Sequence, residues 1–264
     1  MNKDRIELVA RHLFQENQRR AQFEWLKGNF APSSLDEAYA AQTRLHEIWE
    51  EEGIGVIGGW KIAITSPAMQ ELCGIDQPCV GAILQANIHQ GPLSVKLTDY
   101  VRLGLEFELA TILAEDIDPS RAPFDANSAM AVTYEVAPAF ELIEDRAADY
   151  AGFEAYSLVA DNTWNAGVVL GPKLLGWQNI NWDNHPVRLN YNGAEESATT
   201  GEAMGNPFNA LAAVLNNLSK RKIAAKKGQV VITGSTLKTR FAAAGDRARY
   251  SIGELGAVEI AVDN

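Results

Sequence analysis

The heptapeptide LGLEFEL at residues 103–109 decides the fold, because its residues alternate in character with a period of two. Its leucines and its phenylalanine point to one face of an extended strand, whereas Glu106 and Glu108 point to the other face. Such a strand buries its apolar face in a core and carries two carboxylates on the opposite face. We therefore expect a β-sheet at the centre of this protein.

Strand-like patterns also occur on both sides of this heptapeptide. They are WKIAIT (60–65), LGLEFELATIL (103–113), VAPAFELIE (136–144), VVLGP (168–172), VRLNYNG (187–193), QVVITGS (229–235) and VEIAVD (258–263). Helical spacing predicts two helices within residues 4–53 and three shorter ones at 66–73, 125–133 and 206–220. The strands outnumber the helices and do not alternate with them regularly. This favours an α+β fold with a mixed β-sheet roll and flanking helices over a doubly wound parallel sheet.

Length and composition fit a folded protein of one structural unit. The chain has 264 residues, 47% of them hydrophobic and 22% charged. The change of pattern divides it into an N-terminal helical segment, residues 1–54, and a mixed-sheet domain, residues 55–264. Cys73 and Cys79 have neither the spacing of a redox pair nor that of a zinc site, so we interpret both as ordinary thiols.

Charge and hydropathy exclude several classes of function. The net charge of −11 repels nucleic acid and anionic membrane surfaces. No apolar run has the ~18 to 20 residues of a membrane span, and the charged start MNKDRIELVA is unlike a signal peptide. We expect a cytoplasmic protein. The basic residues at 220–227 follow a predicted helix, where they complement its negative end.

Three acidic residues are candidates for a metal site. Glu106 and Glu108 share one strand face, and Glu141 lies in the otherwise apolar run VAPAFELI at 136–143. A buried acid is costly unless it is paired, and neighbouring acids repel each other unless a cation compensates them. Oxygen ligands without cysteine or clustered histidine favour Mg²⁺ or Mn²⁺ over zinc. The alternative is a solvent-facing edge strand, on which alternating glutamate is common.

Lys61 is the candidate cation for this site. In WKIAIT the large apolar residues share one face, which leaves Lys61 beside the small Ala63 and Thr65, where a ligand has room. Three carboxylates around a divalent cation leave a charge of about −1, so an anionic substrate needs another positive group. The alternative is a surface lysine whose stem covers apolar neighbours.

Eight short motifs occur in a characteristic order along the chain. They are LDEAY (35–39) with Gln42, GWKIAITS (59–66), GIDQP (74–78) with Gly81, EFE (106–108), AFELIEDR (139–146), ADN (160–162), GNP (205–207) and ITGS (232–235). Together they resemble the fumarylacetoacetate hydrolase superfamily, and within it the branch of 2-keto-4-pentenoate hydratase and 4-oxalocrotonate decarboxylase. The resemblance implies the mixed-sheet roll of the C-terminal domain of that superfamily.

The resemblance also implies a set of site residues. As metal ligands for Mg²⁺ or Mn²⁺ it implies Glu106, Glu108 and Glu141, and as catalytic residues Lys61, Asp76 and Asp161. As residues that bind substrate it implies Ser66, Asn162, Trp164, Asn165 and Thr233. Backbone N–H groups of the turn at 233–235 can meet a carboxylate.

The chain departs from the family pattern at three positions. Glu144 stands where an aspartate is usual, and Trp164 and Asn165 stand where the family pattern has two small hydroxyl residues. Trp164 either narrows the substrate pocket or packs in the core. If it lines the pocket, the preferred substrate carries an apolar or planar tail.

The activity that the resemblance implies is that of a metal-dependent lyase of aromatic catabolism. It is a hydratase that converts a 2-hydroxy-2,4-dienoate of the 2-keto-4-pentenoate type to a 4-hydroxy-2-oxo acid. Alternatives are a decarboxylase of 2-oxo-3-enedioates of the 4-oxalocrotonate type and an acylpyruvate-type C–C hydrolase. The hydrolases commonly use a His–Glu pair; here His46 and Glu50 are four residues apart on a predicted helix, and we expect His46 to be exposed or packed.

A non-enzymatic alternative is a partner subunit or a protein that only binds an acidic metabolite. The retained site residues argue against loss of the site. We expect a homo-oligomer that binds a small 2-oxo or 2-hydroxy-dienoic acid and neither nucleic acid nor membrane. Association with a sister enzyme of the pathway is an open alternative.

Overall fold

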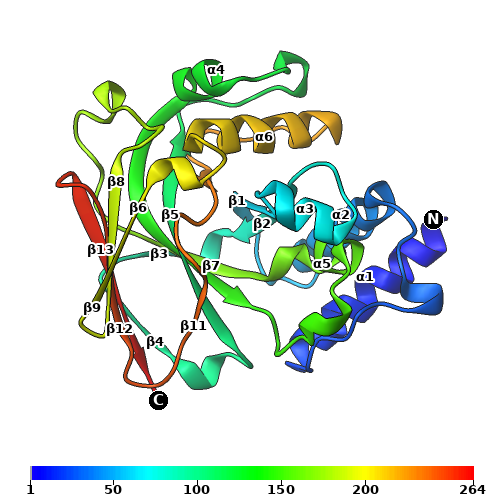
Figure 1. Cartoon of the computed structure of the whole chain (residues 1–264). Helices are drawn as coiled ribbons and strands as arrows, with labels where there is room; N and C mark the ends of the chain where they lie inside the picture. Colours follow the sequence, from blue (N-terminus) through cyan, green and yellow to red (C-terminus); the bar gives the residue numbers. More distant parts are fainter. Residues whose placement is uncertain (1) are drawn as a thin grey trace.

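The computed structural model describes residues 2–264 and contains two β-sheets that share a core (Figure 1). The larger sheet has the order β2-β1-β10-β5-β6-β7-β3, with β11 also paired to β5. These strands are β1 (Ile57–Ala63), β2 (Cys79–Leu84), β3 (Ile88–Gln90), β5 (Leu103–Leu113), β6 (Thr133–Glu144), β7 (Asn165–Leu170), β10 (Val230–Ile232) and β11 (Arg240–Phe241). The pairs β1/β10 and β3/β7 are parallel and the others antiparallel, so the sheet is mixed.

The second sheet has the order β4-β13-β12-β8-β9. Its strands are β4 (Leu93–Lys96), β8 (Pro186–Tyr191), β9 (Ala194–Thr199), β12 (Arg247–Ile252) and β13 (Gly256–Asp263). The apolar face of β5 lies against this sheet: the ring of Phe107 is 5.9 Å from that of Tyr250 on β12. Helix α6 (Pro207–Lys220) packs its apolar side into the same core. The predicted α+β roll is confirmed.

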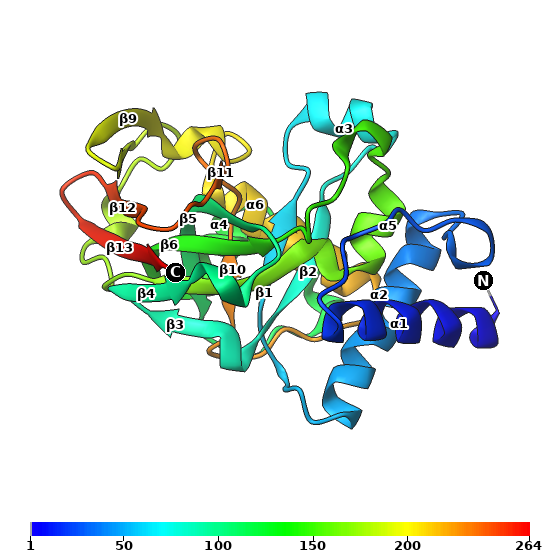
Figure 2. The same ribbon diagram turned by 90° about the horizontal axis from the view of Figure 1, so that it is seen from below.

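The remaining helices are α1 (Lys3–Gln18), α2 (Leu35–Glu51), α3 (Pro67–Cys73), α4 (Ala126–Ala131) and α5 (Ala155–Ala160). Polar side chains cap their N-termini; for example, the Ser34 hydroxyl accepts from the Glu37 N–H at 3.2 Å. Helices α1, α2 and α5 gather at one end of the large sheet (Figures 1 and 2) and share a second core. Because α5 belongs to the segment 55–264, the two predicted segments are joined by this core.

Strand order explains how distant residues come together. Strand β5 is an interior strand with β10 and β6 as neighbours, and β1 lies beyond β10. Glu106 is directly opposite Glu141 in the β5/β6 register. Lys61 pairs with Ile232, which in turn pairs with Ala110 on β5. Within residues 2–264 we find no helix with the length and apolar character that crossing a membrane requires.

Candidate active site

Three carboxylates meet on one face of the large sheet. Glu106 and Glu108 extend from β5 and Glu141 from β6, and one oxygen of each lies within 4.8 Å of the other two. Glu108 and Glu141 are fully buried, and Glu106 is partly buried. The alternative of a solvent-facing edge strand is wrong, because β5 is an interior strand.

Lys61 lies beside this carboxylate cluster, with only 3% of its surface exposed, so the alternative of a surface lysine is wrong. Its Nζ is 3.2 Å from Oε1 of Glu141 and donates to the carbonyl oxygen of Thr163 at 3.3 Å. Burial alone lowers the pKa of Lys61, but the three carboxylates outweigh burial and raise it. Lys61 is therefore a buried cation at neutral pH.

Each carboxylate also accepts one hydrogen bond that fixes its orientation. The donors are the Thr239 hydroxyl to Glu106 at 2.5 Å, the Gly234 N–H to Glu108 at 2.6 Å and the Asn165 amide to Glu141 at 2.8 Å. Gly234 has φ +96°, a conformation that favours glycine, and its N–H meets a carboxylate of the protein itself. The sequence pattern did not indicate Thr239.

Two buried oxygens of the cluster have no hydrogen-bond partner in the described chain, namely Oε1 of Glu108 and Oε2 of Glu141. One lysine cannot neutralise three acids. Burial, together with the neighbouring acids, raises the pKa of Glu108 well above its usual value. Burial raises that of Glu141 to about 7 although Lys61 opposes it. Orphaned oxygens and excess negative charge are features that a divalent cation with oxygen ligands satisfies, so the donor set fits such an ion.

A cavity of about 720 Å³ opens next to the cluster. Lys61, Glu106, Ser66 and Trp164 are among its lining residues. Glu108 and Glu141 contact these charged groups without lining the cavity, and we call the four charged residues together the floor. Most of its other side chains are apolar: Ile62, Ala63, Ile64, Met69, Ile143, Tyr150, Leu158, Leu237 and Phe241. A concave apolar site with a few convergent polar groups is typical of small-molecule binding.

The structure brings other predicted residues to the site less directly or not at all. Asn165 contacts Glu141 and does not line the cavity. Asp76 is exposed on the loop after α3 and does not line the cavity. Asp161 is buried in an ion pair with Arg146, at 3.0 Å, which accounts for its charge. Thr233 is buried and donates its hydroxyl to a carbonyl of β5.

Asn162 is also occupied by the protein and does not line the cavity. Its side-chain amide donates to the Ala82 carbonyl at 2.9 Å, and its Oδ1 accepts from the Ala82 N–H at 2.7 Å. The same Oδ1 lies 2.8 Å from Nε2 of His46 on α2. Since Oδ1 is an acceptor, His46 Nε2 is the donor. Asn162 thus joins helix α2 to strand β2.

The backbone of residues 162–164 is strained. Asn162, Thr163 and Trp164 have φ of 56°, 52° and 59°, which non-glycine residues rarely adopt. Their turn packs directly on Gly81: a Cβ there would lie 2.2 Å from the Thr163 hydroxyl oxygen. We call residues 162–164 the left-handed turn. It presents the Thr163 carbonyl to Lys61 and the Trp164 indole to the cavity.

His46 is packed and does not line the cavity. It is 8% exposed and stacks on Trp49 with ring centroids 5.0 Å apart. Burial lowers the pKa of His46 to about 3, only partly opposed by the Asn162 hydrogen bond, so the ring is neutral near pH 7. Its spacing from Glu50 gave no signal of this role, because its partner is distant in the sequence.

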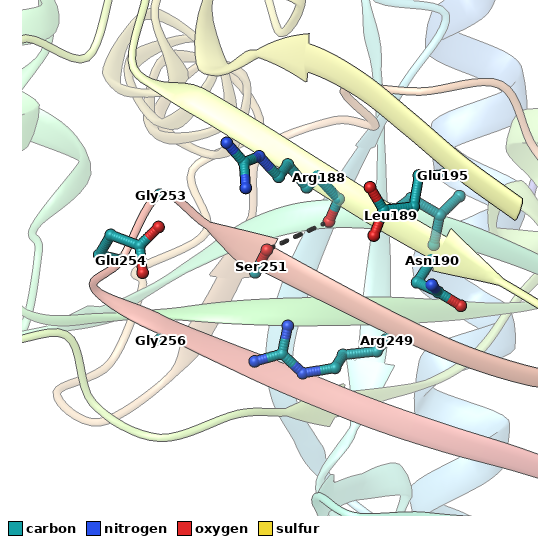
Figure 3. A pocket seen from close by; sticks show the side chains of 9 residues that line it. All are labelled: Arg188, Leu189, Asn190, Glu195, Arg249, Ser251, Gly253, Glu254 and Gly256. Atoms are coloured by element: carbon teal, nitrogen blue, oxygen red, sulfur yellow. Dashed lines mark hydrogen bonds between the residues drawn. The ribbon is translucent and has the colours of Figure 1, made fainter. Parts of the chain in front are cut away.

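A smaller hollow of about 230 Å³ lies on the second sheet, between strands β8, β9, β12 and β13 (Figure 3). Arg188, Arg249, Glu195 and Glu254 extend around it, so its charges are mixed. It includes none of the predicted site residues. The cavity next to Lys61 therefore remains the candidate active site.

Comparisons with known proteins agree with this fold. The family model "Fumarylacetoacetate (FAA) hydrolase C-terminal" matches residues 82–263. The chain is 27% identical over 258 residues to 2-oxo-hept-4-ene-1,7-dioate hydratase of Escherichia coli, with 95% of each protein covered. It is 31% identical over 199 residues to 2-keto-4-pentenoate hydratase of Burkholderia vietnamiensis, covering 75% of this chain and 74% of that one.

A solved structure has a similar fold. The 4-oxalocrotonate decarboxylase from Pseudomonas putida G7, complexed with magnesium and adipate, superposes with a TM-score of 0.91 over 99% of this chain and 98% of that chain. The sequence identity is 19%, so this likeness concerns the fold.

Proposed function

Because the chain belongs to the fumarylacetoacetate hydrolase family, we propose that it is a divalent-metal-dependent hydratase. Its substrate is a 2-hydroxy-2,4-dienoate and its product a 4-hydroxy-2-oxo acid. The observation that carries the proposal is the cluster of Glu106, Glu108 and Glu141 with Lys61 at the floor of one cavity. The hydratases among its relatives support the reaction class.

The chain supplies both a metal site and a proton-transfer group. Glu106, Glu108 and Glu141 would hold Mg²⁺ or Mn²⁺, which when bound supplies a Lewis acid for the carboxylate and C2 oxygen of the substrate. Asn165 and Gly234 keep two of these carboxylates oriented. The ammonium of Lys61 balances negative charge that develops on the substrate and serves as a proton donor.

The reaction has two proton transfers. The C2 hydroxyl loses its proton while C5 gains one, which moves the double bonds to give a 2-oxo-3-enoate. Water then adds its oxygen to C4, and C3 takes a proton. We assign the protonation of C5 to Lys61, because it is the buried cation on the cavity floor. Burial keeps its charge away from bulk water.

Mass analysis of products tests the reaction type. The Mg²⁺-loaded protein is incubated separately with 2-hydroxypenta-2,4-dienoate, with 2-oxohex-3-enedioate and with an acylpyruvate. We expect addition of one water to the dienoate. Loss of carbon dioxide from the enedioate as the main reaction would identify a decarboxylase instead. Cleavage of the acylpyruvate into two acids would identify a hydrolase, and binding without any reaction would identify an acid-binding protein.

We further propose that the enzyme acts in the cytoplasm, in aromatic catabolism, as a homo-oligomer that can associate with a sister enzyme. Its family membership and the hydratases among its relatives support this role. Light scattering of the purified protein, alone and mixed with a candidate partner enzyme, measures the assembly. A monomer in both samples would contradict it.

A further inference from the structure

The cavity is larger than the reacting part of the proposed substrate. A five-carbon hydroxydienoate has about eight non-hydrogen atoms. Even at the ~30 Å³ that a water molecule occupies in the liquid, it would fill at most about a third of the 720 Å³. The space beyond the head group is therefore part of the binding site. This inference rests on the proposed function and concerns its substrate class.

The outer wall of this space is aromatic. Trp164 is 7% exposed and is held by ring contacts with Phe23, Trp25 and Tyr150, at centroid distances of 5.1, 5.9 and 5.9 Å. These contacts fix the indole as one side of the cavity. The prediction that Trp164 lines the pocket and the alternative that it packs in the core thus describe two faces of one ring system.

The rim of the cavity also exposes large apolar side chains. Met69 is 39% exposed, Tyr150 47% and Phe241 48%, and all three line the cavity. They come from α3, from the segment before α5 and from β11. Apolar surface gathered around one opening marks a binding site for an apolar group, because its burial releases water.

The two arginines near the aromatic wall are already engaged. Arg102 stacks over the ring of Phe241 at 4.6 Å, but its guanidinium pairs with Asp145. Arg146 pairs with Asp161. Lys238 lines the cavity from an exposed position, and it also lines an adjacent hollow that it shares with Glu196 and Glu202. Lys238 has no ion pair among residues 2–264, but it is exposed to solvent, so it offers a second carboxylate only a solvated partner outside the aromatic rings.

We propose that the outer half of the cavity selects an uncharged, bulky tail, such as a phenyl group, on the C5 side of the hydroxydienoate. Trp164, Tyr150 and Phe241 are the residues that determine this specificity. The charged tail of a dioate is disfavoured, because a carboxylate would lose water there without gaining a partner. This substrate class differs from the dioate in the name of the Escherichia coli relative.

Binding of unreactive acids tests the proposal without turnover. Calorimetry in Mg²⁺ compares 2-oxohexanoate, 2-oxoheptanedioate and 2-oxo-6-phenylhexanoate, which share the head group and differ only in the tail. We expect the phenyl acid to bind about tenfold tighter than 2-oxohexanoate, and the dioate to bind more weakly than either. Equal affinities, or tightest binding of the dioate, would overturn the tail proposal. Failure of all three to bind would instead contradict the proposed function.

Single-residue variants test which side chains cause the preference for the phenyl acid. Phe241→Ala, at an exposed position that tolerates truncation, should reduce the preference for the phenyl acid over 2-oxohexanoate severalfold. Tyr134→Ala removes an exposed ring outside the cavity and serves as the matched control. An unchanged preference in Phe241→Ala would overturn its role. A tenfold loss of dioate affinity in Lys238→Met would place a carboxylate subsite at the mouth and overturn the proposal.

Trp164→Ser separates a pocket role from a purely structural one. We expect it to lose the phenyl preference, measured by calorimetry on the folded variant. A lower melting temperature with an unchanged preference would reject the assignment of Trp164.

Discussion

The floor and the outer wall of the cavity are built in different ways. The floor consists of charged side chains on β1, β5 and β6, three strands of one sheet, where register fixes their spacing. The wall consists of rings from the left-handed turn, the segment around Tyr150 and β11. A ring contact joins Trp164 to Tyr150, and the Arg102 guanidinium lies over Phe241. The strands position groups that carry out chemistry, and the connecting segments supply recognition. The tail preference of such an enzyme can therefore change without disturbing its floor.

Removal of one floor carboxylate should have the largest effect. Glu108→Gln keeps the shape and removes a buried charge, so Mn²⁺ affinity should fall by more than the roughly 10- to 100-fold that loss of an outer-shell partner costs. Isothermal calorimetry measures it. Glu135→Gln, on the same sheet outside the cluster, is the control. Metal binding as tight as in the parent would remove Glu108 from the site.

Removal of the floor cation should affect turnover. Lys61→Met retains much of the apolar stem, so the protein should fold and bind metal while kcat falls by roughly 10²-fold, the scale for loss of a proton-transfer group. Steady-state kinetics with the dienoate measures it. The second readout is the metal affinity of the variant, which should equal that of the parent. Parent-like kcat would show that Lys61 has no part in the reaction.

The stability of the protein should depend on pH through His46, which contacts Asn162 in the left-handed turn. The pKa of His46 is about 3 in the folded protein and about 6.5 in the unfolded chain, so below pH 6.5 the unfolded chain binds the extra proton. Its contribution to stability is complete above pH 6.5 and is lost as pH falls toward 3. Between pH 6.5 and 5 we expect a loss of about 2 kcal/mol in unfolding free energy.

His46→Gln keeps a donor for Asn162 but does not titrate. Urea unfolding of this variant should therefore show a smaller loss of stability over the same pH interval than the parent shows. The same pH dependence in both proteins would be evidence against a buried, neutral His46.

The smallest expected effect concerns an outer-shell contact of the floor. Asn165→Leu removes the amide that donates to Glu141 at 2.8 Å, and Mn²⁺ affinity should fall by about tenfold. Calorimetry measures this loss, and tail preference should stay constant. If the tail preference changes and the metal affinity does not, Asn165 contributes to substrate specificity and does not support the metal site.

The sequence was most informative where side chains repeat with the period of a strand. Alternation placed Glu106, Glu108 and Lys61 on the correct faces, because the apolar residues between them pack on the opposite faces in the main core. Strand β2 was missed because CVGAIL shows no alternation, both faces being buried. Helix α5 has only six residues, too few for a helical period to be recognised.

The parts of the site that depend on contacts between distant segments could not be predicted. The family resemblance implied that Asn162 binds substrate. Its side-chain amide instead forms hydrogen bonds with Ala82 and His46, which lie 80 and 116 residues away in the chain. Asp161 is likewise paired with Arg146. Neither pairing has a periodic signature. Gly81 was the available clue, since a glycine inside a strand indicates a close approach of another backbone.

The left-handed turn connects three parts of the molecule through three consecutive residues. Asn162 is tied to helix α2, Thr163 accepts from Lys61, and Trp164 forms the wall. A displacement of the Trp164 indole should therefore also move the carbonyl of the preceding residue, Thr163, which accepts from the Lys61 ammonium. A tail that presses against Trp164 should alter kcat as well as affinity, so binding energy gained far from the reacting carbons can be used in the chemical step.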